Sequence, residues 1–160
     1  MPEVDIKTKE VKLANEIFIP EIVKMLNEGH TVTLKLRGIS MRPFLEDDRD
    51  KALIIKAKNI KKGDAVLAEV SKHKYVLHRI IKIDGDDVTL RGDGNIYCEY
   101  CKVSDVKGFI IGFYRKGKNK IDKTNSLKWY IYSYMWCHLY PIRRYLLFLY
   151  RLQLKLHTRK

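Results

Sequence analysis

Apolar and polar positions recur with two different periods along the chain, and each change of period predicts a new element. Between Pro20 and Gly29 the apolar residues follow helical spacing, which predicts one helix. From Thr31 to Arg37 apolar and polar residues alternate strictly, as in a half-buried strand. Further strand-like runs cover 52–55, 65–70, 75–83, 88–90 and 108–114. With a hairpin turn at 84–87, these runs predict a mainly β body, either a coiled antiparallel sheet or an open barrel.

The helical period returns after residue 126. One apolar row of the first C-terminal helix consists of Leu127, Tyr130, Ile131, Tyr134, Met135 and His138. Pro141 starts a second helix. The first helix is aromatic nearly all round, because four more aromatic residues lie outside this row: Trp129, Tyr132, Trp136 and Tyr140. Two interpretations stay open: a helical segment that packs on the β body, or an element that lies on a membrane surface.

Charge divides the 160 residues into two parts. The whole chain has a formal net charge of +13. Residues 1–114 carry 20 basic and 18 acidic residues, a net of +2, whereas 115–160 carry 12 basic residues and one acid, a net of +11. We therefore predict a β domain at 1–114 that includes the opening helix, a basic linker at 115–126, and an aromatic, basic helical extension at 127–160.

Composition excludes several classes of protein. With 46% apolar and 32% charged residues, the chain can build a core. Three cysteines argue against a disulfide scaffold. No signal peptide and no run long enough to span a bilayer is visible, so we expect a cytoplasmic protein or one at the membrane periphery. Because the positive charge lies in the extension, nucleic acid is a less favoured partner than an anionic membrane surface at 127–160.

Three stretches of the β body carry candidate chemistry. Ser40 follows the alternating strand, between glycine and proline, in a position that suits an exposed nucleophile with free backbone N–H groups. His78 lies inside an apolar strand, and Asp93 ends another strand between two glycines. A serine, a histidine and an aspartate can form an acyl-transfer triad, but spacing alone does not establish one.

The same stretches resemble the sequence boxes of one peptidase family. Residues 38–43, Gly-Ile-Ser-Met-Arg-Pro, resemble the nucleophile box of type I signal peptidases and the related SOS-repressor autoproteases. Residues 62–66 resemble the strand box that follows it, His78-Arg79-Ile80 resembles the histidine form of the general-base box, and 92–95 are similar to the box that carries the acid. The four boxes occur in the family's order. The resemblance implies that family's coiled sheet and a serine peptidase that cleaves a leader or signal peptide.

The resemblance also implies roles for individual residues. Ser40 corresponds to the nucleophile, His78 to the base of the endoplasmic-reticulum and archaeal enzymes, and Asp93 to the acid that orients it. Glu99 stands at the offset of a second acid found in some members. The turn that holds the nucleophile and its oxyanion donors would comprise Gly38, Met41 and Pro43. Histidine needs orientation rather than a large pKa shift to act as a base near neutral pH.

Other candidates are weaker. Cys98 and Cys101 form a lone C-x-x-C pair, which does not supply the four ligands of a structural zinc site, so we expect no metal and no cofactor. Lys72 and Lys74 offer an alternative amine base. Two other functions remain as alternatives: an inactive peptide-binding module on the same fold, and a basic protein that binds membrane surfaces.

Overall fold

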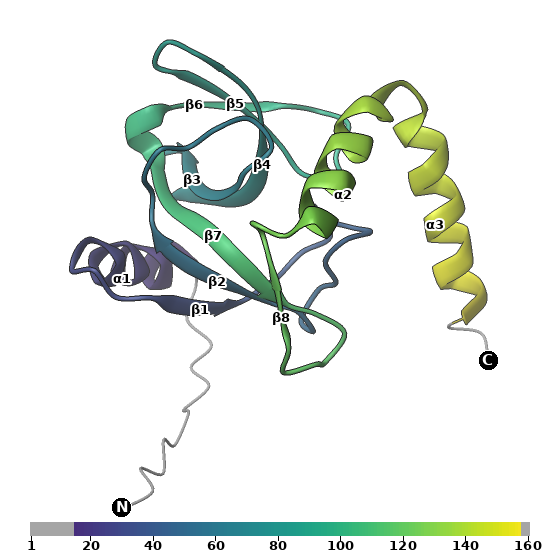
Figure 1. The fold of residues 1–160 in the computed structure, drawn as a ribbon, viewed down its shortest axis with the longest axis horizontal. Helices are drawn as coiled ribbons and strands as arrows, with labels where there is room; N and C mark the ends of the chain where they lie inside the picture. Colours follow the sequence, from purple (N-terminus) through teal and green to yellow (C-terminus); the bar gives the residue numbers. More distant parts are fainter. Residues whose placement is uncertain (1–14, 158–160) are drawn as a thin grey trace, which may run out of the picture.

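The computed structural model describes residues 15–157, with side chains for 18–156. An eight-stranded antiparallel sheet forms the body (Figure 1). The strands are β1 (Val32–Lys35), β2 (Lys51–Lys56), β3 (Ala65–Ser71), β4 (Lys74–Asp84), β5 (Asp87–Arg91), β6 (Glu99–Lys102), β7 (Val106–Tyr114) and β8 (Ile121–Lys123). The helices are α1 (Asn15–Asn27), α2 (Leu127–His138) and α3 (Arg143–His157), with short 3-10 turns η1 (Val103–Asp105) and η2 (Tyr140–Ile142). The prediction of a mainly β body with an opening helix and C-terminal helices is confirmed.

The sheet runs in the order β1-β2-β7-β3-β4-β5-β6, and β8 pairs with β7. Register shifts interrupt four of the strand pairs, for example between Ile80 and Lys82 where β4 pairs with β5. An extra residue on one strand bends it and increases its twist. The shifts therefore let one continuous sheet curl back over itself (Figure 1).

The helix α1 packs against β1, β2, β4 and β7. Its residues Ile19, Ile22 and Leu26 are buried in the larger apolar core, as their spacing predicts. The helix begins upstream of the predicted start, and Pro20 lies inside it. A proline inside a helix removes one backbone hydrogen bond.

A second apolar core lies within the curl of β3, β4 and β5. It contains Val66, Ala68, Ile80, Val88, Leu90 and Val106. Ile80 pairs with Leu90 across β4 and β5, and Leu90 pairs with Glu99 across β5 and β6. In this register β5 lies between β4 and the edge strand β6, and the Glu99 side chain reaches across it to His78.

The segment predicted as a linker contains structure of its own. The strand β8 pairs with the end of β7, and the buried Thr124 hydroxyl donates to the Ile110 carbonyl at 2.8 Å. The helix α2 follows directly and lies against the body, with α3 beside it on the outside (Figure 1). Trp129 of α2 belongs to the larger core. Three residues of β8 thus extend the sheet within the segment predicted as a basic linker.

The face of α2 that packs on the body is opposite to its apolar row. Buried residues are Trp129, Ser133 and Trp136, while Leu127 and Tyr134 of the row are 74% and 67% exposed. Trp129 fits an aromatic cluster with Phe44, at a ring-centroid distance of 5.1 Å. This fit and the polar contacts described below determine which face of α2 packs on the body. The spacing of apolar residues in the sequence does not reveal them. No described helix is long and apolar enough to cross a bilayer.

Candidate active site

Ser40 lies in the turn that follows β1. Gly38 adopts a φ of +93°, a conformation that favours glycine, and its N–H donates to the Asp47 carboxylate at 2.7 Å. Ser40 is half-buried, and its carbonyl accepts a hydrogen bond from the Gly94 N–H at 2.7 Å. Among the described residues, no acceptor is found for the N–H groups of Ser40 and Met41. These two donors are therefore available to an oxyanion at this turn.

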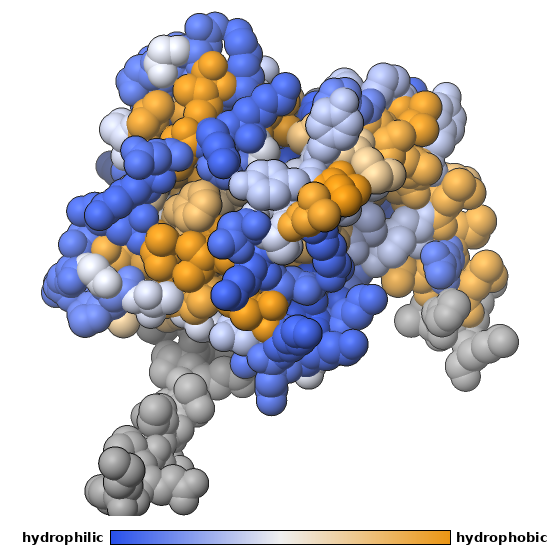
Figure 2. All heavy atoms as spheres, viewed as in Figure 1, coloured by the Kyte–Doolittle hydropathy of each residue, from blue (hydrophilic) through white to orange (hydrophobic). Residues whose placement is uncertain are grey.

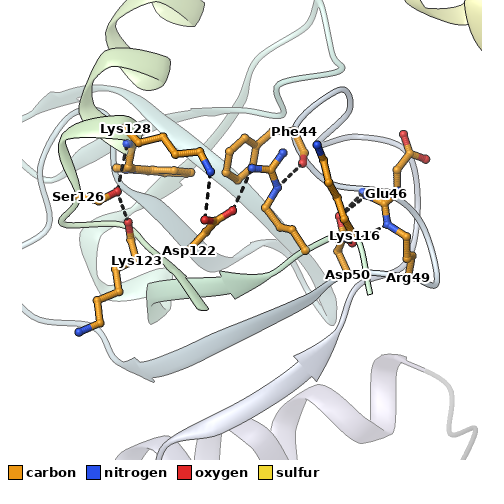
Figure 3. A network of polar contacts seen from close by, with 11 residues as sticks. Phe44, Glu46, Arg49, Asp50, Lys116, Asp122, Lys123, Ser126 and Lys128 are labelled. Carbon is orange, nitrogen blue, oxygen red and sulfur yellow. Dashed lines mark hydrogen bonds and ion pairs between the residues drawn. The ribbon is translucent and has the colours of Figure 1, made fainter. Parts of the chain in front are cut away.

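The loop residues after Ser40 are restrained by the core and by the Asp50 carboxylate. Met41 is 5% exposed and belongs to the core. The buried Asp50 carboxylate accepts hydrogen bonds from the N–H groups of Glu46 and Lys116 and from the Arg49 side chain (Figure 3). Burial opposes ionisation of Asp50, but these donors hold its pKa below the usual value. The carboxylate thus joins the second half of the nucleophile loop to the chain that follows β7.

A second set of contacts fixes the loop from the side of β8. The Arg115 side chain donates to the Phe44 carbonyl at 2.9 Å and lies over the Phe44 ring at 3.7 Å. It also pairs with Asp122, which contacts Lys128 at the start of α2 (Figure 3). Pro43 is half-buried and lines an open groove against α2. Ser40 therefore projects from a loop whose backbone is restrained at several points.

His78 lies on β4 with 3% of its surface exposed. Its Nδ1 is 2.5 Å from the Glu99 Oε2, and Glu99 comes from the edge strand β6. Burial lowers the pKa of His78, while the negative charges of Glu99 and Asp93 oppose that change. The neutral imidazole, which can accept a proton, is thus the favoured form around neutral pH.

The opposite edge of the imidazole faces the nucleophile turn, as the surroundings of Gly92 show. A Cβ at Gly92 would overlap the Ser40 carbonyl and would lie 2.9 Å from His78 Nε2. Only glycine therefore lets the 92–95 turn pass between Ser40 and His78. No hydrogen bond links the Ser40 hydroxyl with the His78 ring among the described side chains, but both residues line one pocket of about 130 Å³. The aliphatic residues of this pocket are Leu36, Met41, Leu45, Val76 and Leu77.

Asp93 lies beside Arg79. Its two carboxylate oxygens accept hydrogen bonds from Arg79 Nε at 2.9 Å and Nη2 at 2.8 Å, a two-point contact in which both side chains are buried. Tyr132 of α2 donates to the same carboxylate at 3.0 Å, and the Trp136 indole donates to the Asp93 carbonyl. The structure thus places Asp93 against Arg79 and α2, and places Glu99 against the Nδ1 of His78.

Arg79 is the residue of this site that sequence reasoning did not single out, although it stands in the box that contains His78. Besides Asp93, it donates to the Gly63 carbonyl and the Ser133 hydroxyl, and its guanidinium lies 4.5 Å from the Trp129 ring centroid. Burial alone would lower the pKa of Arg79, but Asp93 more than offsets this and keeps it raised. The available signal was an arginine beside His78 in the otherwise apolar run of 76–81.

The remaining candidates lie outside this arrangement. Lys74 is exposed, with its Nζ 3.9 Å from Glu99, and Lys72 is exposed in the turn between β3 and β4. Burial raises the pKa of the Cys101 thiol to about 11, and Cys98 and Cys101 are both free. Within residues 15–157 no group of three or more potential ligands could hold a metal ion.

Comparison with known proteins adds one finding. A family model described as Peptidase S24-like matches residues 4–106. The match contains the strands β1 to β6, and with them Ser40, His78, Asp93 and Glu99, whereas α2 and α3 lie beyond it. A search of the curated proteins found no match.

Proposed function

The chain belongs to the Peptidase S24-like family, and on this premise we propose that it is a serine endopeptidase in which Ser40 attacks, His78 acts as base and Glu99 orients His78. The family's fold is that of peptidases and autoproteases. One observation carries the proposal: the two edges of the His78 ring face different groups. Nδ1 contacts Glu99, and the Nε2 edge faces Gly92 beside Ser40.

Each step of the reaction has a group to perform it. Neutral His78 takes the proton of the Ser40 hydroxyl at Nε2 while the oxygen attacks the scissile carbonyl. The N–H groups of Ser40 and Met41 are positioned to donate to the negative oxygen of the tetrahedral intermediate. Glu99 stabilises the imidazolium, which then gives its proton to the leaving amine. Water repeats the sequence on the acyl-enzyme and regenerates Ser40.

The substrate we propose is an extended peptide, a leader or signal peptide. The strand β1 ends the sheet order, no described strand pairs with its outer edge, and it leads directly to Ser40. A peptide that adds to such an edge presents alternate side chains to the protein. The small pocket beside Ser40, which is lined in part by apolar side chains, suits the side chain next to the cleaved bond. The histidine base and the four boxes support a relation to the signal peptidases within this group.

The test uses the full chain and a library of synthetic peptides, with cleavage products identified by mass spectrometry. Ser40→Ala should lower all cleavage at least ~10³-fold, because the nucleophile is lost. The matched control is Ser104→Ala, an exposed serine of η1, which should cleave as the unmodified protein does. Equal cleavage by Ser40→Ala would reject the assignment. Peptides that bind in the pocket and stay intact would support the inactive binding module instead.

A further inference from the structure

The outer face of α3 carries an apolar row that the body does not cover. Tyr145, Leu149, Leu152 and Leu156 follow one another at i, i+4, i+7 and i+11, a single face of a helix. Between 45% and 63% of the surface of each is exposed. On the opposite face Leu147 is only 4% exposed. The helix is thus apolar on both sides, and among the described residues only one side packs against the rest of the protein.

The neighbouring helix α2 repeats this arrangement. Its buried face packs on the body through Trp129, Ser133 and Trp136, and its outer face exposes Leu127, Tyr130, Ile131, Tyr134 and Met135. Figure 2 shows hydrophobic side chains gathered on the α3 side of the molecule. Exposed apolar surface of this extent marks an interaction site. The two tryptophans, for which the sequence left both body packing and a membrane surface open, lie in the protein interior.

The charges around these rows indicate which partner fits. Arg144, Arg151 and Lys155 lie along one flank of the α3 row, and Lys128 lies exposed on α2. The sequence from 123 to 160 contains no aspartate or glutamate. A second copy of the chain would bring the same positive charges to this face, and the repulsion opposes self-association. An anionic surface complements both the charge and the apolar rows.

We propose that the exposed faces of α2 and α3 bind the surface of an anionic lipid bilayer, with both helices in the plane of the interface. Tyrosine and leucine side chains would enter the headgroup region, and the arginines would meet lipid phosphates. Tyr150, on the body side of α3, donates a hydrogen bond to Glu46, which lines the Ser40 pocket. Docking would therefore hold the pocket close to the bilayer. That last consequence rests on the proposed peptidase function, whereas lipid binding does not.

Sedimentation of the full chain with vesicles tests the proposal. The protein should sediment with vesicles of phosphatidylcholine and phosphatidylglycerol and bind far more weakly to phosphatidylcholine alone. Arg144→Gln with Arg151→Gln should weaken binding about thirtyfold, since each basic residue near an anionic surface contributes about 1 kcal/mol and about 1.4 kcal/mol corresponds to tenfold. The matched control, Lys56→Gln with Lys72→Gln, removes the same charge from the body and should change binding little.

A second pair of variants tests the apolar row. Leu149→Gln with Leu152→Gln should weaken vesicle binding at least about tenfold, because two leucine side chains no longer enter the interface. Tyr100→Gln, an exposed residue of β6, is the control and should bind as before. Ser40→Ala should also bind as before, which separates this proposal from the peptidase function. Protein that ignores anionic vesicles, or a dimer that the leucine variants dissolve, would overturn the proposal.

Discussion

His78 and Arg79 are neighbours on β4, and each contacts a carboxylate. The two pairs differ in the exposure of the carboxylate and in the number of contacts between the partners. Arg79 and Asp93 are completely buried and joined at two points, and α2 adds further hydrogen bonds. Glu99 keeps 27% of its side chain exposed and meets His78 at one point, while the other edge of the ring faces the nucleophile turn. The first pair is built to stay fixed. The second leaves one nitrogen of a titratable ring available for proton transfer.

Removing the charge of Asp93 gives the largest effect that we predict from this comparison. Asp93→Asn should lower the free energy of unfolding by about 3–5 kcal/mol, because Arg79 is left buried without its counter-ion. Urea denaturation measures the change. The control is Asp84→Asn, which removes an exposed carboxylate that pairs with Lys82 and should leave the unfolding midpoint nearly unchanged. Equal midpoints for both variants would show that Asp93 has no structural role.

Removing the charge of Glu99 should affect activity instead of stability. Glu99→Gln should lower kcat/KM about 10²-fold, a loss of about 2.7 kcal/mol in transition-state stabilisation, because an amide does not stabilise the imidazolium. Steady-state kinetics on a peptide that the unmodified protein cleaves measures it, beside urea denaturation of the same variant. If Asp93→Asn lost more activity per folded molecule than Glu99→Gln, the two carboxylates would have to exchange the roles proposed above.

A smaller effect should appear in how kcat/KM and stability depend on pH, because only the His78 pair titrates near neutral pH. Burial lowers the pKa of His78, so the rising limb of kcat/KM should be centred below about 6.5, the ordinary value for histidine. Glu99 raises this pKa, and Glu99→Gln should therefore move the limb to lower pH. The unfolded chain binds the His78 proton more readily than the folded chain, so stability should also fall as the pH drops below about 6.5. A limb centred above pH ~8.5 would indicate a lysine base.

Local patterns predicted most of the fold. Strict alternation from Thr31 to Arg37 predicted β1, and short apolar runs predicted five of the other strands. The short strands β6 and β8 have no such pattern, since only pairing with β5 and β7 holds them in extended form. The same limit affects the helices. Their spacing predicted α2 and α3, but a helix that is apolar on both sides does not reveal which side the body covers.

The chemistry divides in the same way. Sequence alone determined the kinds of residue available: a serine in a glycine–proline turn, a histidine in an apolar strand, two later acids and an acid-free C-terminal segment. Only the tertiary structure decided that Glu99 contacts His78 and that Asp93 contacts Arg79. The register in which Ile80 pairs with Leu90, and Leu90 with Glu99, lets the Glu99 side chain reach His78 across β5. The 92–95 turn carries Asp93 to Arg79, where Tyr132 of α2 also donates to it. Such contacts depend on strand register and helix packing, which involve residues far apart in the chain and leave no local period.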